Sequence, residues 1–179
     1  MSFNIQSFIK ALPSGGARPT LFKVDLGSPF ESNLGTITSV LVQATSLPSS
    51  SIGPIELPYM GRKIRFAGDR TFDTWDVTVI NDEDFKIRNA MEIWHNRING
   101  LQENISTTSP AEYKQQVVVH QYGKTDDESP IRSYKFHGMF PIEISPIELD
   151  WNDTDNVERF TVRFAYDWYS VEGPTGAVI

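Results

Sequence analysis

The chain has 179 residues, a formal net charge of -7 at pH 7 and no cysteine, and 39% of its residues are hydrophobic. This length suits one domain with one core, and the apolar content excludes wholesale disorder. The acidic balance disfavours a general nucleic-acid binder, though not a local basic patch, and the lack of cysteine excludes disulfides and thiolate metal sites. We expect a single domain over residues 1–179, with its core at about 17–169, a flexible N-terminus at 1–16 and a C-terminal tail at 170–179.

Neither a secretory signal nor a membrane span is expected. The first residues lack a basic start followed by an apolar stretch, and no run reaches the roughly 18 apolar residues that a spanning helix needs. After synthesis, the protein is therefore expected to be in the cytosol of the cell that makes it.

The first half of the chain is expected to hold strands and one long arm. Strands are predicted at residues 20–25 and 36–43. Residues 45–58 carry three prolines, a serine run and a glycine, which favours an extended loop or arm over a tight turn. Strands follow at 62–67 and 72–80, and the second shows strict alternation of apolar and polar residues, typical of a half-buried strand.

One segment has helical spacing. From Asp82 to Ile98 the apolar residues recur every three or four positions, which predicts an amphipathic helix at about 82–99 that braces one face of a sheet. Asn81 is expected to cap this helix, and Gly100 is expected to end it in the left-handed conformation.

The remaining chain returns to strands, at residues 116–122, 131–137 and 159–168. A solvated hairpin tip is expected at 123–130 and a mobile tail at 172–179. The predicted fold class is mainly β, a two-sheet antiparallel sandwich or barrel with one flanking helix.

No constellation of residues predicts catalysis, a metal or a cofactor. Gly123-Lys124-Thr125 lacks the earlier glycine of a phosphate-binding loop, and the three histidines are scattered. The oxygen-rich run at 150–155 lacks the glycine and glutamate of a calcium loop, so a solvated turn is the preferred interpretation. No serine lies in a nucleophile-elbow setting. We expect a protein that is not an enzyme and that holds no cofactor.

The densest polar cluster lies between residues 62 and 76, where charged residues alternate with apolar ones. One interpretation is an ordinary charged strand surface. The other is an interface, in which forked arginine donors and carboxylates pair neighbouring subunits in a defined register.

The same region carries a family resemblance. The run from Pro58 to Glu83, with Ala67-Gly-Asp-Arg-Thr-Phe72 at its centre, resembles the tail tube protein of contractile-tailed bacteriophages. Further blocks match in the same order over about 150 residues. They are Ala17-Arg18-Pro19 to Leu21-Phe22 and Ala44 to Pro48 before this run, and Pro110 to Lys114, Gln121-Tyr122, Gly138 to Pro141 and Glu148 to Trp151 after it. That family is related in fold to the needle protein of type VI secretion.

The resemblance implies a structural subunit of the virion, assembled in the host cytoplasm. Such subunits form hexameric rings that stack into a tube, and strands of all six line a channel for the tape-measure protein and then the genome. The tail sheath, the baseplate or tube initiator and the tail terminator are the implied partners. Two alternatives stay open: an initiator or hub protein of the same fold, and a carboxylate-based hydrolase on a β-sandwich.

Two expectations follow for the surface. Residues 45–58 are the predicted ring-to-ring arm, and the channel is predicted to carry net negative charge so that DNA slides through it. The candidate contacts between subunits or rings are Leu47, Ile52, Ile55, Leu57, Met60, Arg62, Lys63, Asp69, Arg70 and Asp73.

Overall fold

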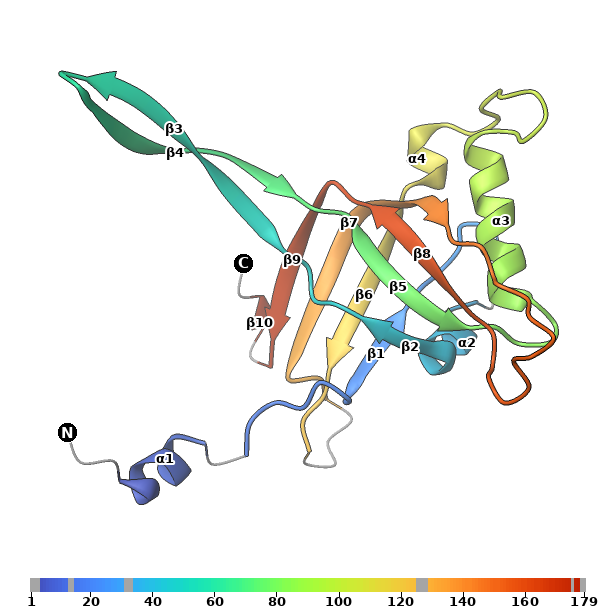
Figure 1. The fold of residues 1–179 in the computed structure, drawn as a ribbon, viewed down its shortest axis with the longest axis horizontal. Coiled ribbons are helices and arrows are strands. Elements are labelled where there is room, and N and C mark those ends of the chain that lie inside the picture. Colours follow the sequence, from blue (N-terminus) through green and yellow to red (C-terminus); the bar gives the residue numbers. More distant parts are fainter. Residues whose placement is uncertain (1–3, 13–14, 31–33, 125–128, 175, 178–179) are drawn as a thin grey trace.

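The computed structural model describes residues 4–12, 15–30, 34–124, 129–174 and 176–177 (Figure 1). Its helices are α1 (Ile5–Ala11), α2 (Leu34–Leu41), α3 (Lys86–Ile98) and α4 (Pro110–Tyr113). Its strands are β1 (Phe22–Asp25), β2 (Val42–Thr45), β3 (Ser50–Tyr59), β4 (Arg62–Phe72), β5 (Trp75–Ile80), β6 (Gln115–Gln121), β7 (Arg132–Ile144), β8 (Arg159–Ala165), β9 (Trp168–Gly173) and β10 (Gly176–Ala177).

The long strand β7 joins two antiparallel sheet regions. The order is β1-β6-β7-β8-β5-β2, and β9 also pairs with β7. Along one edge of β7 the pairs run from Ser133↔Glu172 through His137↔Trp168 to Phe140↔Ala165, so β9 and β8 follow each other on a single ladder. The predicted strand at 159–168 is thus divided at residues 166–167, where the sheet bends. The mainly β, antiparallel fold class is confirmed.

The core lies between these two sheet regions. Trp75 of β5 and Phe136 of β7 meet with ring centroids 4.6 Å apart, and both side chains are buried. The indole N–H of Trp75 donates to the carbonyl of Ser46 at 2.7 Å, so its one polar atom is satisfied. Alternation along β5 and β8 directs Val77, Val79 and Val162 into the same core, as the sequence predicts.

Helix α3 packs against β7 and α2 with the face that the sequence predicts. Ile87, Ala90, Met91 and Trp94 are buried, and the Trp94 indole donates to the carbonyl of Tyr113 at 2.9 Å. The predicted cap is wrong, because the helix begins four residues later than residue 82, after Phe85. Asn81 instead donates its backbone N–H and its side-chain amide to Glu158, the residue just before β8.

Two further local predictions are wrong. Gly100 does not take the left-handed conformation, and Asn99 ends α3 with φ -152°. The segment predicted as a strand at 36–43 is mostly helix α2. Its Thr38 is fully buried, and the Thr38 hydroxyl lies 3.0 Å from the carbonyl of Leu34 and 3.1 Å from that of Leu26. The contact with Leu26 fixes the helix to the body. The β-branched residues of this segment favour a strand and give no sign of that contact.

The termini extend beyond this body. Helix α1 has no buried residue, and Figure 1 shows it apart from the sheets. Strand β10 pairs with β9, so part of the tail expected at 172–179 is in strand pairing, while residues 175, 178 and 179 lie outside the described ones. The predicted tip at 123–130 connects β6 to β7, and its residues 125–128 also lie outside them. Within the described ranges, no helix has the length and apolar character to cross a membrane.

Candidate subunit-contact surface

The most prominent surface feature is the β3–β4 hairpin, which projects from the body (Figure 1). Its strands pair from Ser50↔Phe72 to Tyr59↔Arg62. The connection is Met60-Gly61, with φ of 45° and 78°, the two left-handed residues of a two-residue hairpin turn. The predicted arm at 45–58 is therefore confirmed as extended, but it is a paired strand and its partner strand belongs to the arm as well.

The outer half of the hairpin has one apolar and one charged face. Ile55 lies opposite Phe66 and Leu57 opposite Ile64, and because side chains alternate, Tyr59 joins them. These five side chains are all more than 40% exposed, which leaves a continuous apolar strip in water. An apolar strip of this kind marks an interaction surface in a stable protein.

The opposite face is organised around a single carboxylate. Glu56 accepts a hydrogen bond from Lys63 at 2.7 Å and another from Arg65 at 3.1 Å. These ion pairs are exposed and contribute little to stability, but they fix which side of the hairpin is charged. Arg62, at the turn, lies opposite Tyr59 on the face of the apolar strip and has no carboxylate partner among the described residues.

A bulge divides this outer half from the base. The register shifts between Ile52 and Pro54, where one extra β4 residue is accommodated. A Cβ atom on Gly68 would lie 2.6 Å from the carbonyl oxygen of Gly53, so only glycine permits the strands to approach this closely. The bulge thus depends on a glycine within the Ala67–Phe72 motif.

The base of the hairpin is fixed to the body by aromatic packing. Phe72 contacts Tyr166 and Tyr169, with ring centroids 5.8 and 5.6 Å apart. The Tyr166 hydroxyl donates to the carbonyl of Ser49 at 3.3 Å, and burial raises the pKa of this tyrosine, so the hydroxyl keeps its proton. The hairpin therefore leaves the body in a defined direction.

The predicted contact residues gather on this hairpin and its base. Ile52, Ile55 and Leu57 lie on β3, Met60 in the turn, and Arg62, Lys63, Asp69 and Arg70 on β4. Leu47 lies in the connection from β2 to β3, and Asp73 follows β4 and accepts a hydrogen bond from Ser49 at 3.0 Å. The prediction missed Tyr59, Ile64 and Phe66 of the apolar strip, although the alternation of apolar and charged residues along 62–66 was its signal.

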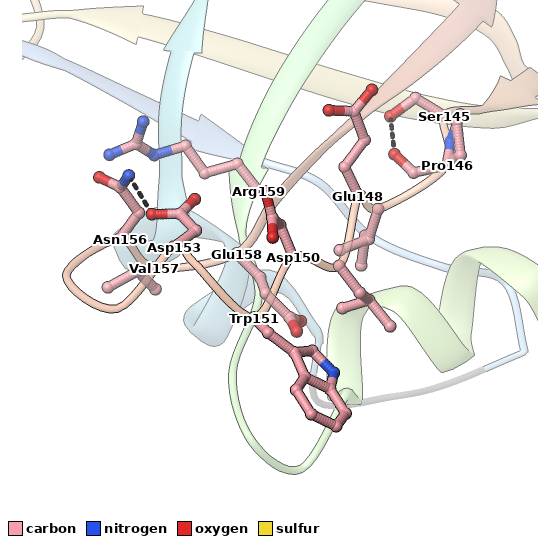
Figure 2. Close-up of a pocket in the computed structure, with 12 residues that line it drawn as sticks. Ser145, Pro146, Glu148, Asp150, Trp151, Asp153, Asn156, Val157, Glu158 and Arg159 are labelled. Carbon is pink, nitrogen blue, oxygen red and sulfur yellow. Dashed lines mark hydrogen bonds between the residues drawn. The ribbon is translucent and has the colours of Figure 1, made fainter.

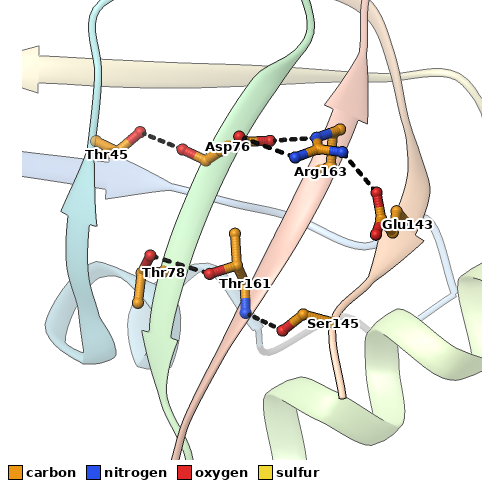
Figure 3. Close-up of polar contacts among 7 residues, drawn as sticks. All are labelled: Thr45, Asp76, Thr78, Glu143, Ser145, Thr161 and Arg163. Carbon is orange, nitrogen blue, oxygen red and sulfur yellow. Dashed lines mark hydrogen bonds and ion pairs between the residues drawn. The ribbon is translucent and has the colours of Figure 1, made fainter. Parts of the chain in front are cut away.

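A second polar surface covers the outward face of β5, β8 and β7 (Figure 3). Arg163 lies between two carboxylates, with Nε 2.9 Å from Asp76 and a terminal nitrogen 2.7 Å from Glu143. The hydrogen bonds and negative charge of Asp76, and then the charge of Glu143, raise the pKa of Arg163. Thr78 and Thr161 continue the ladder, with hydroxyl oxygens 3.2 Å apart.

A third surface is the connection from β7 to β8, residues 145–158, which we call the acid loop (Figure 2). It lines an open cavity of about 670 Å³. Asp150 accepts from the backbone and side-chain amides of Asn152, which confirms the turn expected there. In the part of the chain that the structure describes, no group of three histidine or acidic side chains could hold a metal ion.

The fold is shared with components of contractile injection systems. A structure of the anti-feeding prophage cap aligns with a TM-score of 0.65 and 15% identity over 88% of this chain and 91% of that one. A sheath-tube complex of an extracellular contractile injection system, PVC, aligns with a TM-score of 0.60 and 12% identity over 96% of this chain and 99% of that one.

Comparisons of sequence show which family within this class of proteins the chain belongs to. The family model for phage tail tube protein matches residues 11–172. Tail tube protein gp19 of Enterobacteria phage T4 is 34% identical over 92% of this chain and 98% of its own length. The tail tube protein of Serratia phage KSP90 is 31% identical over 71% of each. The chain belongs to the phage tail tube protein family, and it is a structural subunit of the virion tail.

Proposed function

We propose that this chain closes into six-membered rings that stack into the tube of a contractile tail, with the β3–β4 hairpin as the arm that joins neighbouring subunits. The hairpin carries this proposal. No described part of the chain covers its apolar strip, Ile55, Leu57, Tyr59, Ile64 and Phe66, and its base is fixed by Phe72. A rigid, apolar extension is costly in a monomer and is satisfied when a second copy covers it.

The channel would be lined by the outward face of β2, β5, β8 and the end of β7. The hairpin continues the chain of β2 and β5 directly, so this sheet region and the arm form one surface (Figure 1). Four charged side chains lie on the outward face of β5, β7 and β8, and they balance: Asp76 and Glu143 against Arg159 and Arg163. A net negative channel stays a prediction. The four side chains named here carry no net charge, and a face without net positive charge also gives DNA no anchor.

The assembly has an ordered set of partners. A protein of similar fold occurs in a sheath-tube complex, which supports a sheath around this tube. The initiator at the baseplate and the terminator at the other end would mark the two ends of the tube. The tape-measure protein and then DNA would occupy the channel without sequence-specific binding. Assembly would take place in the host cytoplasm, and the role is structural, not enzymatic.

The test starts from the purified chain. Negative-stain microscopy and size exclusion should show tubes or stacked rings. Isolated rings alone would favour an initiator or hub protein, and a stable monomer at high concentration would overturn the proposal.

A hairpin variant separates assembly from folding. Deleting residues 49–54, the simplest change from sequence, would remove half of β3 and leave β4 without its partners from Ala67 to Phe72. A better variant replaces residues 55–66 with Asn-Gly, because Pro54 and Ala67 are opposite each other and the shortened strands keep their pairing. It should keep the thermal transition of the body and lose tubes. Leu101→Ser, which changes an apolar side chain 87% exposed beyond α3, is the control and should still assemble.

A further inference from the structure

The acid loop carries exposed apolar side chains that no residue described by the structure covers. Trp151 is 100% exposed and Leu149 is 80% exposed, and in Figure 2 the Trp151 ring points away from the other lining residues. A tryptophan held fully in water beside an open cavity is poorly placed in a monomer, because its large apolar surface stabilises only when buried.

The charge of the acid loop is of one sign. It holds five carboxylates and no basic residue: Glu148, Asp150, Asp153, Asp155 and Glu158. None of the five forms an ion pair among the residues that the structure describes, and the hydrogen bonds that Asp150 and Asp153 accept come from neutral amides and the backbone. The loop therefore presents uncompensated negative charge around an apolar centre.

The hairpin presents the complementary combination. Residues 50–72 hold four cationic and two anionic side chains, a net charge of +2. Glu56 compensates Lys63 and Arg65, while Arg62 at the turn faces water without a carboxylate partner within the described chain. Met60 beside it is 88% exposed. An apolar tip flanked by free positive charge thus matches an apolar centre flanked by free negative charge.

The two surfaces lie at opposite ends of the molecule. In the view of Figure 1, whose long axis is horizontal, the hairpin tip is at the upper left and the acid loop is at the lower right. One chain cannot bring them together, but two chains in head-to-tail order can. Complementary surfaces at opposite ends define a heterologous interface, which repeats from copy to copy.

We propose that the hairpin tip of one copy seats on the acid loop of the next copy. Arg62 faces Asp150 and Asp153 of the neighbour, and Met60 and Tyr59 cover Leu149 and Trp151. This inference rests on the proposed function, because it names the surface that receives the arm. Charge sets the orientation of the contact, and the apolar side chains supply most of its free energy.

The absence of cysteine from the chain makes the contact measurable by cross-linking. A Met60→Cys/Asp153→Cys double variant, assembled and treated with a short bis-maleimide, should give a ladder of dimers, trimers and larger species on a denaturing gel. Each single variant should give no ladder. The control pair Met60→Cys/Leu101→Cys has the same exposure and should stop at dimers.

The outcomes separate the inference from the proposed function. Assembled tubes without the ladder would overturn the inference and leave the tube function standing, with the acid loop free for a partner other than this chain. A chain that never assembles would overturn both.

Charge reversal gives a second, independent readout. Arg62→Glu should reduce the fraction of chain that sediments as tubes at least tenfold, because it places like charges across the contact. Adding Asp150→Arg and Asp153→Arg to it should restore most of that fraction at low salt. Restoration by the loop changes identifies the acid loop as the receiving surface, whereas failure to restore tubes in a folded triple variant would contradict the pairing.

Discussion

The carboxylate of Asp167 occupies the position that a side chain on residue 138 would need. Gly138 has φ +68°, and a Cβ atom built on it would overlap the Asp167 carboxylate. That carboxylate is held there by Lys114, whose Nζ lies 2.9 and 2.7 Å from its two oxygens. The two residues face each other at the bend of β7, where the ladder passes from β9 to β8.

Gly138→Ala should therefore destabilise the subunit. Alanine is strained at this φ and must also displace an ion-paired carboxylate, so we expect a loss of about 2 kcal/mol or more in the free energy of unfolding. Denaturant unfolding measures it. Gly27→Ala is the control, since a Cβ there meets nothing within 4 Å and φ is not positive, and it should stay within about 0.5 kcal/mol of the wild type.

The second prediction compares a buried tryptophan, Trp75, with a fully exposed one, Trp151. Trp75→Phe removes a buried ring and the hydrogen bond to the Ser46 carbonyl, so unfolding should become easier by about 1–3 kcal/mol. Trp151→Phe changes a side chain that is fully exposed in the monomer and should leave the unfolding midpoint unchanged. Equal effects of the two changes on the unassembled chain would contradict the core described above.

The bulge in the hairpin gives a third prediction, on assembly instead of stability. Gly68→Ala brings a Cβ to 2.6 Å from the Gly53 carbonyl oxygen and forces the strands apart, which redirects the hairpin tip. We expect normal thermal unfolding of the body, because the outer hairpin contributes nothing buried, and a large loss of tubes by microscopy. Gly53→Ala, in the same bulge but with open space at its Cβ, should assemble; failure of both variants would remove the specific role of Gly68.

The fourth prediction concerns pH. Burial, and then the positive charge of Lys135, lower the pKa of His137 below its ordinary value of about 6.5. Its ring stacks on Trp168 with centroids 3.8 Å apart, and Gln116 donates to Nδ1 at 3.1 Å, which suits the neutral ring. The unfolded chain therefore binds a proton first as pH falls. Stability from this residue is complete above the ordinary pKa and declines below it, toward the lowered pKa.

The measurement is the thermal midpoint at pH 7.5 and pH 5.5. The midpoint of the wild type should fall more between these two conditions than that of His137→Gln, which has no proton to gain. His95→Gln, on α3, serves as the control and should keep the pH dependence of the wild type. An identical pH dependence in His137→Gln would show that the half-buried His137 ring is not its source.

Sequence reasoning succeeded where local pattern and tertiary environment agree. The alternation at Trp75, Val77 and Val79 and the helical spacing from Ile87 to Trp94 each describe one buried face, and both elements are confirmed. The Ala67–Phe72 motif that carries the family resemblance lies on β4 and contains the glycine that the bulge needs, but the sequence did not predict that β4 pairs with β3.

The errors arose where a distant partner decides the local structure. Helix α2 has β-branched residues typical of strands, but Thr38 bonds the carbonyl of Leu26, which sequence spacing does not reveal. Strand β3 contains Pro54 and Pro58, which argue against a strand in a sheet interior. In the hairpin, one edge of β3 pairs with β4 and the other edge is free. Two prolines four residues apart can place their ring nitrogens, which lack an N–H, on the free edge, where no strand needs the hydrogen bond. The acid loop had no periodicity at all, and only the fold places it opposite the hairpin.

The hairpin and the body share strand direction, and this sets how the subunit responds to mechanical load. In Figure 1, β4 runs on into β5, which is hydrogen-bonded to β2 on one side and β8 on the other. A pull on the arm along its axis therefore loads these ladders in shear, so that many hydrogen bonds must break together. An unzipping geometry would break them one at a time. The arm would therefore pull free of a neighbouring subunit before the subunit that carries it unfolds.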